Sequence, residues 1–427
     1  MCYYAHGMNS QPVSSKPPLS PVIHKAFKFR LYPNAEQRIA LAQQFGCARM
    51  VYHHFLRQRI DFYAAHKGEK KQGLTYVETN KMLTALKRQP EDLWLNDVNS
   101  QALQESLRPL DRAYKNFFAG RAEFPKFKRK HDHQAFHVPQ HFALDAERGR
   151  LTIPKLTPLK IVVHRPLQGV MKSVTISRTP SGRYFASILC EVEAKEQPPK
   201  RRGKKTGLDL GLKSFVVTSE GEQVEMPGYL RKAETKLAHL QRELSRKKAD
   251  SQNRIKAKIK VARLHEKIAN QRADFLHKQS RRLIDDNQAI YLESLNVKGM
   301  LANHHLAQSI SDAGWGEFLR QLQYKGAWYG CRVEAVSRFF PSSQRCHQCG
   351  YIKTDLRLTD REWECAQCHT LHDRDVNAAR NILNEGQALA KQRTKCRAGV
   401  ARTQTPGETC ASKAGQGTRK PPALAVR

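Results

Sequence analysis

The sequence contains no long hydrophobic run, and this absence excludes two classes of protein. No stretch approaches the roughly 18 consecutive apolar residues that a transmembrane helix needs. The segment 1–22 is rich in serine and proline and lacks the apolar core of a secretory signal. We therefore expect neither a membrane-spanning nor a secreted protein.

Acidic residues are scarce beside basic ones. The chain has 427 residues, with 74 Lys and Arg against 39 Asp and Glu, a net charge of +35 and a pI near 10.0. A small acidic metabolite does not need so strong a positive field, whereas a polyanion does. Nucleic acid is therefore the predicted partner, and an anionic membrane surface is the weaker alternative.

Cysteine is too sparse for a disulfide scaffold, but four of the ten cysteines are regularly spaced. They form two Cys-x-x-Cys pairs on either side of the segment 350–364: Cys346, Cys349, Cys365 and Cys368. Two such pairs predict a zinc ribbon in which four thiolates surround Zn²⁺. A site closed by four cysteines is structural rather than catalytic and indicates a reducing compartment. Four free thiols remain the alternative, as does replacement of one ligand by His347, His369 or His372.

The spacing of apolar residues predicts several elements. We expect a strand at 24–32, then a helix capped by Asn34 and Gln37, and a second helix that carries leucines and aromatics over 103–117. Strands follow over 135–195, with a hairpin turn at 180–182. Two long helices over 229–287, short strands at 289–292 and 331–336, and helices at 315–322 and 375–383 complete the pattern.

Two basic segments are candidates for contacts with nucleic acid. The first lies at 124–130, where basic residues alternate with phenylalanines, and the second joins the two long helices. Basic groups neutralise phosphates, and aromatic rings stack on bases. A solvated charged surface is the plainer interpretation of either segment. The candidate residues are Lys126, Lys128, Arg129, Lys130, Arg246, Lys247 and Lys248.

Three acids stand beside apolar runs, where burial is costly unless the carboxylate is paired or bound to metal. Asp209 lies in the motif GLDLG, Glu293 ends the run IYLE, and Asp375 lies in DRDVNAAR. Three carboxylates from separate elements could bind two Mg²⁺ ions about 4 Å apart for phosphodiester hydrolysis. Taken singly, each has a plainer interpretation, as a turn residue, a surface residue or a first-turn helix acid.

The chain resembles the TnpB (OrfB) family of insertion-sequence proteins, which are related to compact type V CRISPR nucleases. The resemblance rests on GLDLG, YLESLNVKGM, SSQRCHQCG and WECAQCHTLHDRDVNAARNI, in that order. The segments AFKFRLYPNAEQ, FGCARMVYHHFL, FPKFKRK and YKGAWYG add to it. Several separated motifs make it specific, and it covers about residues 24–385.

The resemblance implies an α/β fold with helical and β modules. An RNase H-like (RuvC) nuclease domain with an inserted zinc ribbon follows a wedge β-barrel-like domain, which a helical recognition domain interrupts. The expected boundaries are a disordered extension at 1–22, wedge domain at 23–33 and 123–200, helical domain at 34–122, nuclease domain at 201–340 and 372–385, zinc ribbon at 341–371, and a disordered basic tail at 386–427.

The activity that the resemblance implies is RNA-guided cleavage of double-stranded DNA next to a short motif. The family's catalytic and Mg²⁺-binding acids fall on Asp209, Glu293 and Asp375, with Asp373 as the rejected neighbour, and Mn²⁺ is a possible substitute metal. Its structural Zn²⁺ ligands fall on the four spaced cysteines. The implied partners are a guide RNA from the end of the element and target DNA, with one protein monomer per RNA. The implied location is the bacterial cytoplasm, at the nucleoid when the protein is bound to DNA.

Three other functions remain open. A transposase that performs strand transfer could use the same three acids, and its product would be joined DNA ends. A non-catalytic regulator of transposition that binds DNA or RNA would not need the acids. A zinc-ribbon protein associated with RNA or the ribosome would account for the charge and the cysteines alone.

Overall fold

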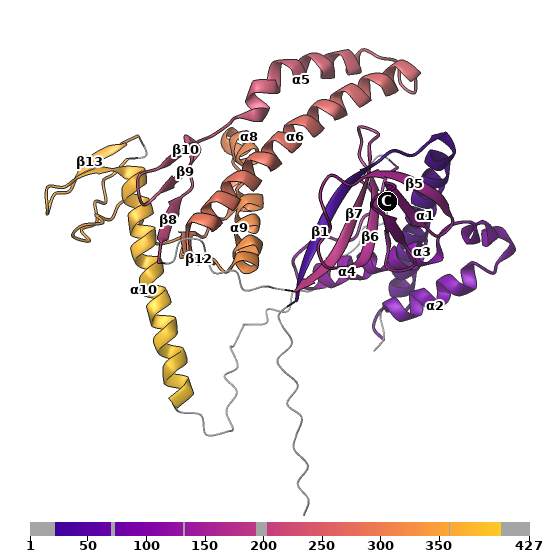
Figure 1. The fold of residues 1–427 in the computed structure, drawn as a ribbon, viewed down its shortest axis with the longest axis horizontal. Helices are drawn as coiled ribbons and strands as arrows, with labels where there is room; N and C mark the ends of the chain where they lie inside the picture. The colour runs from indigo at the N-terminus through magenta and orange to yellow at the C-terminus, as the bar shows by residue number, and fades with distance from the viewer. Residues whose placement is uncertain (1–21, 70–72, 131–132, 194–202, 358, 403–427) are drawn as a thin grey trace, which may run out of the picture. The chain divides into compact units, whose positions relative to one another are not determined.

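The computed structural model describes residues 22–69, 73–130, 133–193, 203–357 and 359–402 (Figure 1). The chain forms two compact units. The first contains 1–198, 228–281 and 327–330, and the second contains 199–227, 282–326 and 331–427. Residues 1–21 of the extension predicted at 1–22, and residues 403–427 of the predicted tail, lie outside the described residues, whereas Val22 begins a strand. Within the described part of the chain, no helix combines the length and apolar character needed to cross a membrane.

The first unit is built on an antiparallel seven-stranded sheet with the order β2-β6-β7-β1-β5-β4-β3. Its strands are β1 (Val22–Leu31), β2 (Gln134–Val138), β3 (Ala143–Asp145), β4 (Arg150–Ile153), β5 (Leu156–Val162), β6 (Val170–Arg178) and β7 (Tyr184–Glu193). Every second side chain along these strands points to the same face of the sheet, as in strands that are buried on one face. These side chains form a core around Phe29, Leu31 and Ile188. The predicted first strand and the hairpin turn, with Gly182 at a φ of +83°, are confirmed.

A helical group completes this part of the first unit. It contains α1 (Ala35–Ala65), α2 (Tyr76–Leu86), the 3₁₀ helix η1 (Pro90–Asn96), α3 (Ser100–Glu105) and α4 (Leu107–Phe118). The predicted capping box is present, because Asn34 and Gln37 each accept the other's backbone N–H. The second predicted helix is divided at Ser106 into α3 and α4, although Leu103, Leu107 and Leu110 all pack in one core as the spacing indicates.

The two predicted long helices are α5 (Tyr229–Ser245) and α6 (Gln252–Asp286). Both helices belong mainly to the first unit. The second unit therefore does not contain all of the segment 201–340, which the sequence suggests as one part of a single domain. Glu266 of α6 accepts a hydrogen bond of 2.6 Å from the Ser181 hydroxyl and lies 3.4 Å from Arg183. These contacts fix α6 to the turn between β6 and β7.

The second unit contains a five-stranded sheet with the order β10-β9-β8-β11-β12. Its elements are β8 (Lys205–Asp209), β9 (Ser214–Thr218), β10 (Gln223–Glu225), β11 (Ala289–Glu293), α7 (Val297–Met300), α8 (His304–Ala313), α9 (Trp315–Tyr329), β12 (Arg332–Val336), β13 (Glu362–Glu364), β14 (Leu371–Asp373) and α10 (Arg374–Arg402). Strands β8 to β10 are antiparallel neighbours, and β11 runs parallel to both β8 and β12. Consecutive residues of β9 and β11 are buried, as in strands covered on both faces.

Helix α10 lies directly against this sheet (Figure 1), and glycines permit the close approach. A Cβ at Gly207 of β8 would stand 2.0 Å from the backbone oxygen of Ala379, and one at Gly386 would stand 2.2 Å from the ring of Tyr291. The predicted disordered tail from Gly386 is therefore wrong as far as Arg402. Helix α10 continues through Gly386, because a residue without a side chain leaves room there for the ring of Tyr291. The next turn of the helix buries Ala390.

We expect Gly207→Ala to destabilise the second unit, because the atom it meets is backbone and cannot rotate away. Overpacking of this kind costs about 3 kcal/mol, which lowers the midpoint of thermal unfolding by roughly 6–12 °C for a unit of this size. Gly316→Ala in α9 is the matched control, since nothing lies within 4 Å of its Cβ position. Equal midpoints for the two variants would show that α10 does not pack so closely on β8.

Candidate active site and zinc site

The pairing of β8 with β11 brings two of the predicted acids together. In the parallel register of the two strands, Asp209 and Glu293 fall opposite each other, one position beyond the final ladder pair of Leu208 and Leu292. Side chains alternate along a strand, so Asp209 shares the face of Gly207, and Glu293 shares the face of Tyr291. Since Gly207 and Tyr291 both meet α10, the two carboxylates lie on the face that α10 covers.

The third acid enters from the first turn of α10. Asp375 lines a cleft of about 370 Å³ with Asp209 and Glu293, and the other lining residues are Ser342, Ser343, Arg361 and Arg374. Asp373 does not line this cleft. Its Oδ1 instead accepts the backbone N–H of Val376 at 2.8 Å, which caps the start of α10. The structure therefore brings together the three acids that the sequence singled out and leaves Asp373 apart.

The carboxylates of the cleft destabilise one another's charge. Burial, followed by the nearby charges of Asp375 and Glu293, raises the pKa of Asp209 to about 7. Burial also raises the pKa of Glu293. Arg361 partly compensates this charge, because its Nη1 lies 3.4 Å from both carboxylate oxygens of Asp375. Perturbed acids in a cleft are typical of functional sites, where stability is given up for a reactive arrangement.

This arrangement predicts a pH-dependent gain in stability for Asp209→Asn. Because the pKa of Asp209 is raised from 3.8 to about 7 on folding, the carboxyl opposes folding increasingly as the pH rises through that window, by about 4 kcal/mol at most. The variant should therefore unfold at a higher temperature than the wild type at pH 8, and at nearly the same temperature at pH 4. The measurement uses magnesium-free buffer without a chelator, so that a bound zinc is kept.

Asp250→Asn is the matched control for this measurement, since Asp250 is exposed in the turn between α5 and α6. It should leave the unfolding temperature unchanged at both pH values. An Asp209→Asn protein whose stability relative to wild type is the same at pH 8 and pH 4 would contradict the raised pKa.

The four spaced cysteines form a compact cluster. Their Sγ atoms all lie within 4.8 Å of one another, with 3.6 Å between Cys346 and Cys368 and 3.5 Å between Cys349 and Cys365. Zinc bound tetrahedrally at about 2.3 Å from each sulfur requires sulfur atoms about 3.8 Å apart, so the donor set fits Zn²⁺. Among the residues that the structure describes, no other group of acids, histidines or cysteines is packed as tightly for one ion.

Two similar turns hold the cysteines. Gly350 and His369 each follow the second cysteine of a pair, with φ of +84° and +55°, and each donates its N–H to the first cysteine's carbonyl. None of the three histidines belongs to the cluster itself. His347 contacts Asn377, His369 contacts Glu364, and the buried His372 lies with Nε2 3.1 Å from Cys346 Sγ. His372 is thus a neighbour that orients the thiol of Cys346.

Two buried asparagines of α10 connect this cluster to the acid cleft. Asn377 accepts the backbone N–H of His347 at 3.0 Å and donates to the carbonyl of Arg345 at 2.8 Å. Asn381 donates to the carbonyl of Ser342 at 2.8 Å. The loop that they hold lines the cleft at one end and carries Cys346 of the cysteine cluster at the other. The position of Asp375, two residues before Asn377, therefore depends on the ribbon.

The basic candidates lie on the surface of the first unit. Arg246, Lys247 and Lys248 are exposed between α5 and α6, where Arg254 holds the turn by donating to the carbonyls of Leu244 and Lys247. The other four are exposed in the segment 124–130, although the Lys128 ammonium extends to 4.0 Å from the ring centroid of Tyr52. Lys128 thus ties the segment to α1, whereas Lys126, Arg129 and Lys130 are exposed.

Sequence reasoning missed the remaining residues of the cleft, Ser342, Ser343, Arg361 and Arg374. Arg361 is one of 74 basic residues, and nothing in its neighbours marks it. Only the pairing of β13 with β14 brings Arg361 near the start of α10. The two serines could have been found from the sequence, because they lie between β12, the strand that pairs with β11 and its Glu293, and Cys346, the first of the spaced cysteines.

Comparison with protein families gives three matches along the chain. Residues 187–304 match the OrfB family of IS605 elements, described as a probable transposase. Residues 315–382 match the TNB domain of Cas12f1-like proteins. Residues 23–68 match a helix-turn-helix domain of the same OrfB group, and here they form β1 and the single helix α1.

Comparison with individual proteins agrees with these families. A candidate RNA-guided DNA endonuclease of Streptomyces pristinaespiralis is 42% identical over 86% of this chain and 90% of its own. InsQ of Escherichia coli K12, described in the same way, is 37% identical over 86% and 93%. A cryo-EM structure of a Cas12f1–sgRNA–target DNA complex shares the fold with a TM-score of 0.52, at 13% identity, over 84% of this chain and 98% of the Cas12f1 chain.

Proposed function

This chain belongs to the OrfB (TnpB) family, and we propose that it is an RNA-guided DNA endonuclease that cuts double-stranded DNA next to a short motif. Family membership follows from 42% identity to a relative over nearly its full length. The observation that carries the activity is the convergence of Asp209, Glu293 and Asp375 in one cleft of a chain with a net charge of +35. A nuclease needs both features, whereas an RNA-binding zinc-ribbon protein needs only the charge.

We assign the second unit to the RNase H-like (RuvC) nuclease domain. Three antiparallel strands continue into two parallel strands reached through helices, with the acids at the ends of neighbouring strands. The zinc ribbon is then an insertion between β12 and α10. In the first unit, the seven-stranded sheet corresponds to the wedge domain and α1 to α4 to the recognition domain.

The acid cleft suits Mg²⁺, with Mn²⁺ as a substitute, because carboxylate oxygens are the ligands that these hard ions prefer. Bound there, two such ions would activate a water molecule and stabilise the oxygen that leaves the phosphodiester. The three acids would hold the cations. This requires Asp209 to lose its proton, so cleavage should weaken below about pH 7.

Two arginines border the cleft and act on its charge. Arg361 contacts Asp375, and the positive charge of Arg374 favours ionised Asp209. Both side chains line the cleft that a DNA phosphate would have to enter to reach the acids. They therefore supply the positive charge that admits a polyanion to an acidic site.

Sequence selection in this proposal belongs to the RNA. Base pairing between guide RNA and one DNA strand reads the target, while basic surfaces of the protein hold both backbones. The excess of positive charge serves the RNA and the DNA together. One monomer with one RNA, acting in the bacterial cytoplasm, remains a prediction.

One observation favours a transposase, because the OrfB family that residues 187–304 match is described as a probable transposase. The same three acids could serve strand transfer. The products separate the two functions, since a transposase yields joined DNA ends and a guided nuclease yields simple breaks.

Co-purification tests the RNA requirement. The protein is expressed with the DNA that flanks its gene and purified at high salt, and any retained RNA is sequenced. One discrete RNA that ends in a variable segment from beyond the element is the expected result. A mixture of unrelated RNAs would mean that the positive charge binds polyanions without selection, and the guided activity would then be rejected.

A further inference from the structure

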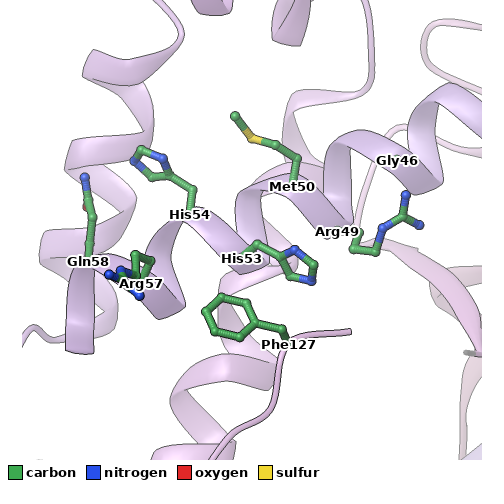
Figure 2. A pocket seen from close by; sticks show the side chains of 8 residues that line it. All are labelled: Gly46, Arg49, Met50, His53, His54, Arg57, Gln58 and Phe127. Atoms are coloured by element: carbon green, nitrogen blue, oxygen red, sulfur yellow. The ribbon is translucent and has the colours of Figure 1, made fainter. Parts of the chain in front are cut away.

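A hollow of about 550 Å³ lies along α1 in the first unit, and none of its lining residues belongs to the acid cleft or to the cysteine cluster. Figure 2 shows the side chains around it, of which all but Phe127 come from α1. The lining residues are Gly46, Arg49, Met50, His53, His54, Arg57, Gln58 and Phe127. Its volume is in the range of small-ligand pockets and larger than one simple anion fills.

The wall of this pocket is formed by the basic segment at 124–130. His53 donates a hydrogen bond to the backbone carbonyl of Lys128, and its ring meets Phe127 edge to face, with centroids 5.3 Å apart. The Lys128 ammonium lies over Tyr52, the neighbour of His53 on α1. These contacts hold Phe127 in place and leave its ring 48% exposed. Figure 2 shows that ring beside the imidazole of His53.

The charges in the pocket are positive and incompletely paired. Arg57 lies 3.3 Å from Asp61, an exposed pair of little strength. Half-buried Arg49 has no carboxylate within ion-pair distance among the described residues. Burial above all, with the nearby charges of Arg49 and Lys128, lowers the pKa of His53, so this imidazole is neutral at physiological pH. An anionic group is therefore favoured at the arginines, and a neutral group beside His53.

Two polar atoms of the pocket residues also lack partners. His53 Nε2 and Gln58 Oε1 are buried and form no hydrogen bond. Because the other nitrogen of His53 carries the proton donated to Lys128, Nε2 is an acceptor, as Oε1 is. Unsatisfied buried acceptors are costly. A small rotation of the Gln58 amide or of the Phe127 ring would open these atoms to a ligand that donates N–H or O–H groups.

We propose that this pocket binds one unstacked nucleotide of a nucleic-acid strand, with its base on Phe127, its phosphate at Arg49 and Arg57, and its donor groups at Gln58 and His53. Every nucleotide combines these three chemistries: a flat ring, an anion and at least one amino, imide or hydroxyl donor. Stacking on an aromatic side chain with cations along the backbone is the general mode of single-strand binding. This inference deepens the proposed function, and rests on it for the source of the strand, which is either the RNA or the DNA.

Ultraviolet cross-linking of the full-length protein tests the position of the nucleotide. Protein carrying its co-purified RNA is irradiated and digested, and nucleotide-bearing peptides are identified by mass spectrometry. In parallel, RNA-free protein is irradiated with a 20-mer of 4-thiouridine RNA or of 4-thiothymidine DNA. We expect adducts on the peptide containing Phe127 or on α1, and the arm that gives them identifies the strand. Adducts found only elsewhere would overturn the proposal.

Binding measurements at 0.5 M salt, which suppresses nonspecific charge attraction, give the second readout. Phe127→Ala should weaken binding of fluorescent 20-mer rU or dT by about 5- to 100-fold, whereas Phe118→Ala, at a ring 73% exposed on α4, should not. Gln58→Leu should weaken binding by about 5- to 10-fold while raising the unfolding temperature, since it removes an unsatisfied buried acceptor. Gln279→Leu, which removes the same kind of atom on α6, should raise stability without affecting binding.

The outcomes separate this inference from the proposed function. If guided cleavage is normal and both pocket variants bind as the wild type does, the pocket has no such role and the nuclease assignment stands. If no specific RNA co-purifies but the pocket variants still lose affinity for the 20-mers, the pocket is confirmed and the guided activity is rejected.

Discussion

Replacement of Asp209 by alanine is expected to abolish DNA cleavage while leaving RNA bound. The carboxylate lies beside Glu293 at the ends of two paired strands, and its loss leaves too few oxygens to hold two cations. Metal ions supply several kcal/mol of charge stabilisation in such reactions, and every ~1.4 kcal/mol of barrier changes a rate about tenfold. A fall of more than about 10³-fold in the rate of strand cleavage follows, measured with protein of equal RNA content.

Asp373→Ser is the matched control for this loss. Asp373 is an acid of the same motif, but it caps α10 through the N–H of Val376 and stands outside the cleft. Serine keeps a capping oxygen and removes the charge, so cleavage should remain near the wild-type rate. Cleavage by a folded Asp209→Ala protein at the wild-type rate, or loss of cleavage in Asp373→Ser equal to that in Asp209→Ala, would refute the assignment of the acids.

Cys365→Ser is expected to remove the bound zinc and to unfold the ribbon. Cys365 is fully buried in the cluster, and its Sγ lies 3.5 Å from that of Cys349. Structural zinc contributes about 10–16 kcal/mol to the folding of small zinc domains, far more than the few apolar contacts around Trp363 supply. Zinc content, measured by atomic absorption, should fall from one ion per chain to none.

The consequence should extend to the acid cleft. Asn377 and Asn381 attach the loop before the first zinc ligand to α10, so a disordered ribbon frees the segment that carries Asp375. We therefore expect cleavage to be lost with the zinc. His369→Asn, next to the second knuckle but paired with Glu364, should keep both. Wild-type cleavage by a zinc-free Cys365→Ser protein would show that the two sites are independent.

The convergence of the three acids and of the four cysteines was predictable from the sequence because each residue is marked locally. Asp209 and Glu293 end short apolar strands, and side-chain alternation alone places each on the same face as a residue that meets α10. Regular spacing likewise marks the cysteines. What the spacing cannot give is the register of β8 against β11, which decides that the two carboxylates are neighbours.

The sequence was misleading where a residue's role depends on a distant contact. Gly386 and the polar residues after it are typical of a helix end, yet α10 continues because Tyr291 occupies the space that a side chain would fill. Arg361 has no local signature, since its role arises from the fold of the ribbon. Only part of the pocket on α1 was predictable. The basic segment that contains Phe127 was recognised from the sequence, but the contact of Phe127 with His53 joins elements that are distant in the sequence.

Retargeting is the most direct test of the central claim. The RNA recovered with the protein is synthesised with two different variable segments, and each complex is incubated with Mg²⁺ and plasmids that carry either matching sequence beside a library of flanking motifs. We predict that each complex linearises only the plasmid that matches its own RNA, next to one short motif, and that the ends remain unjoined. Cleavage that does not change with the RNA, or DNA ends joined to a second site, would contradict the account.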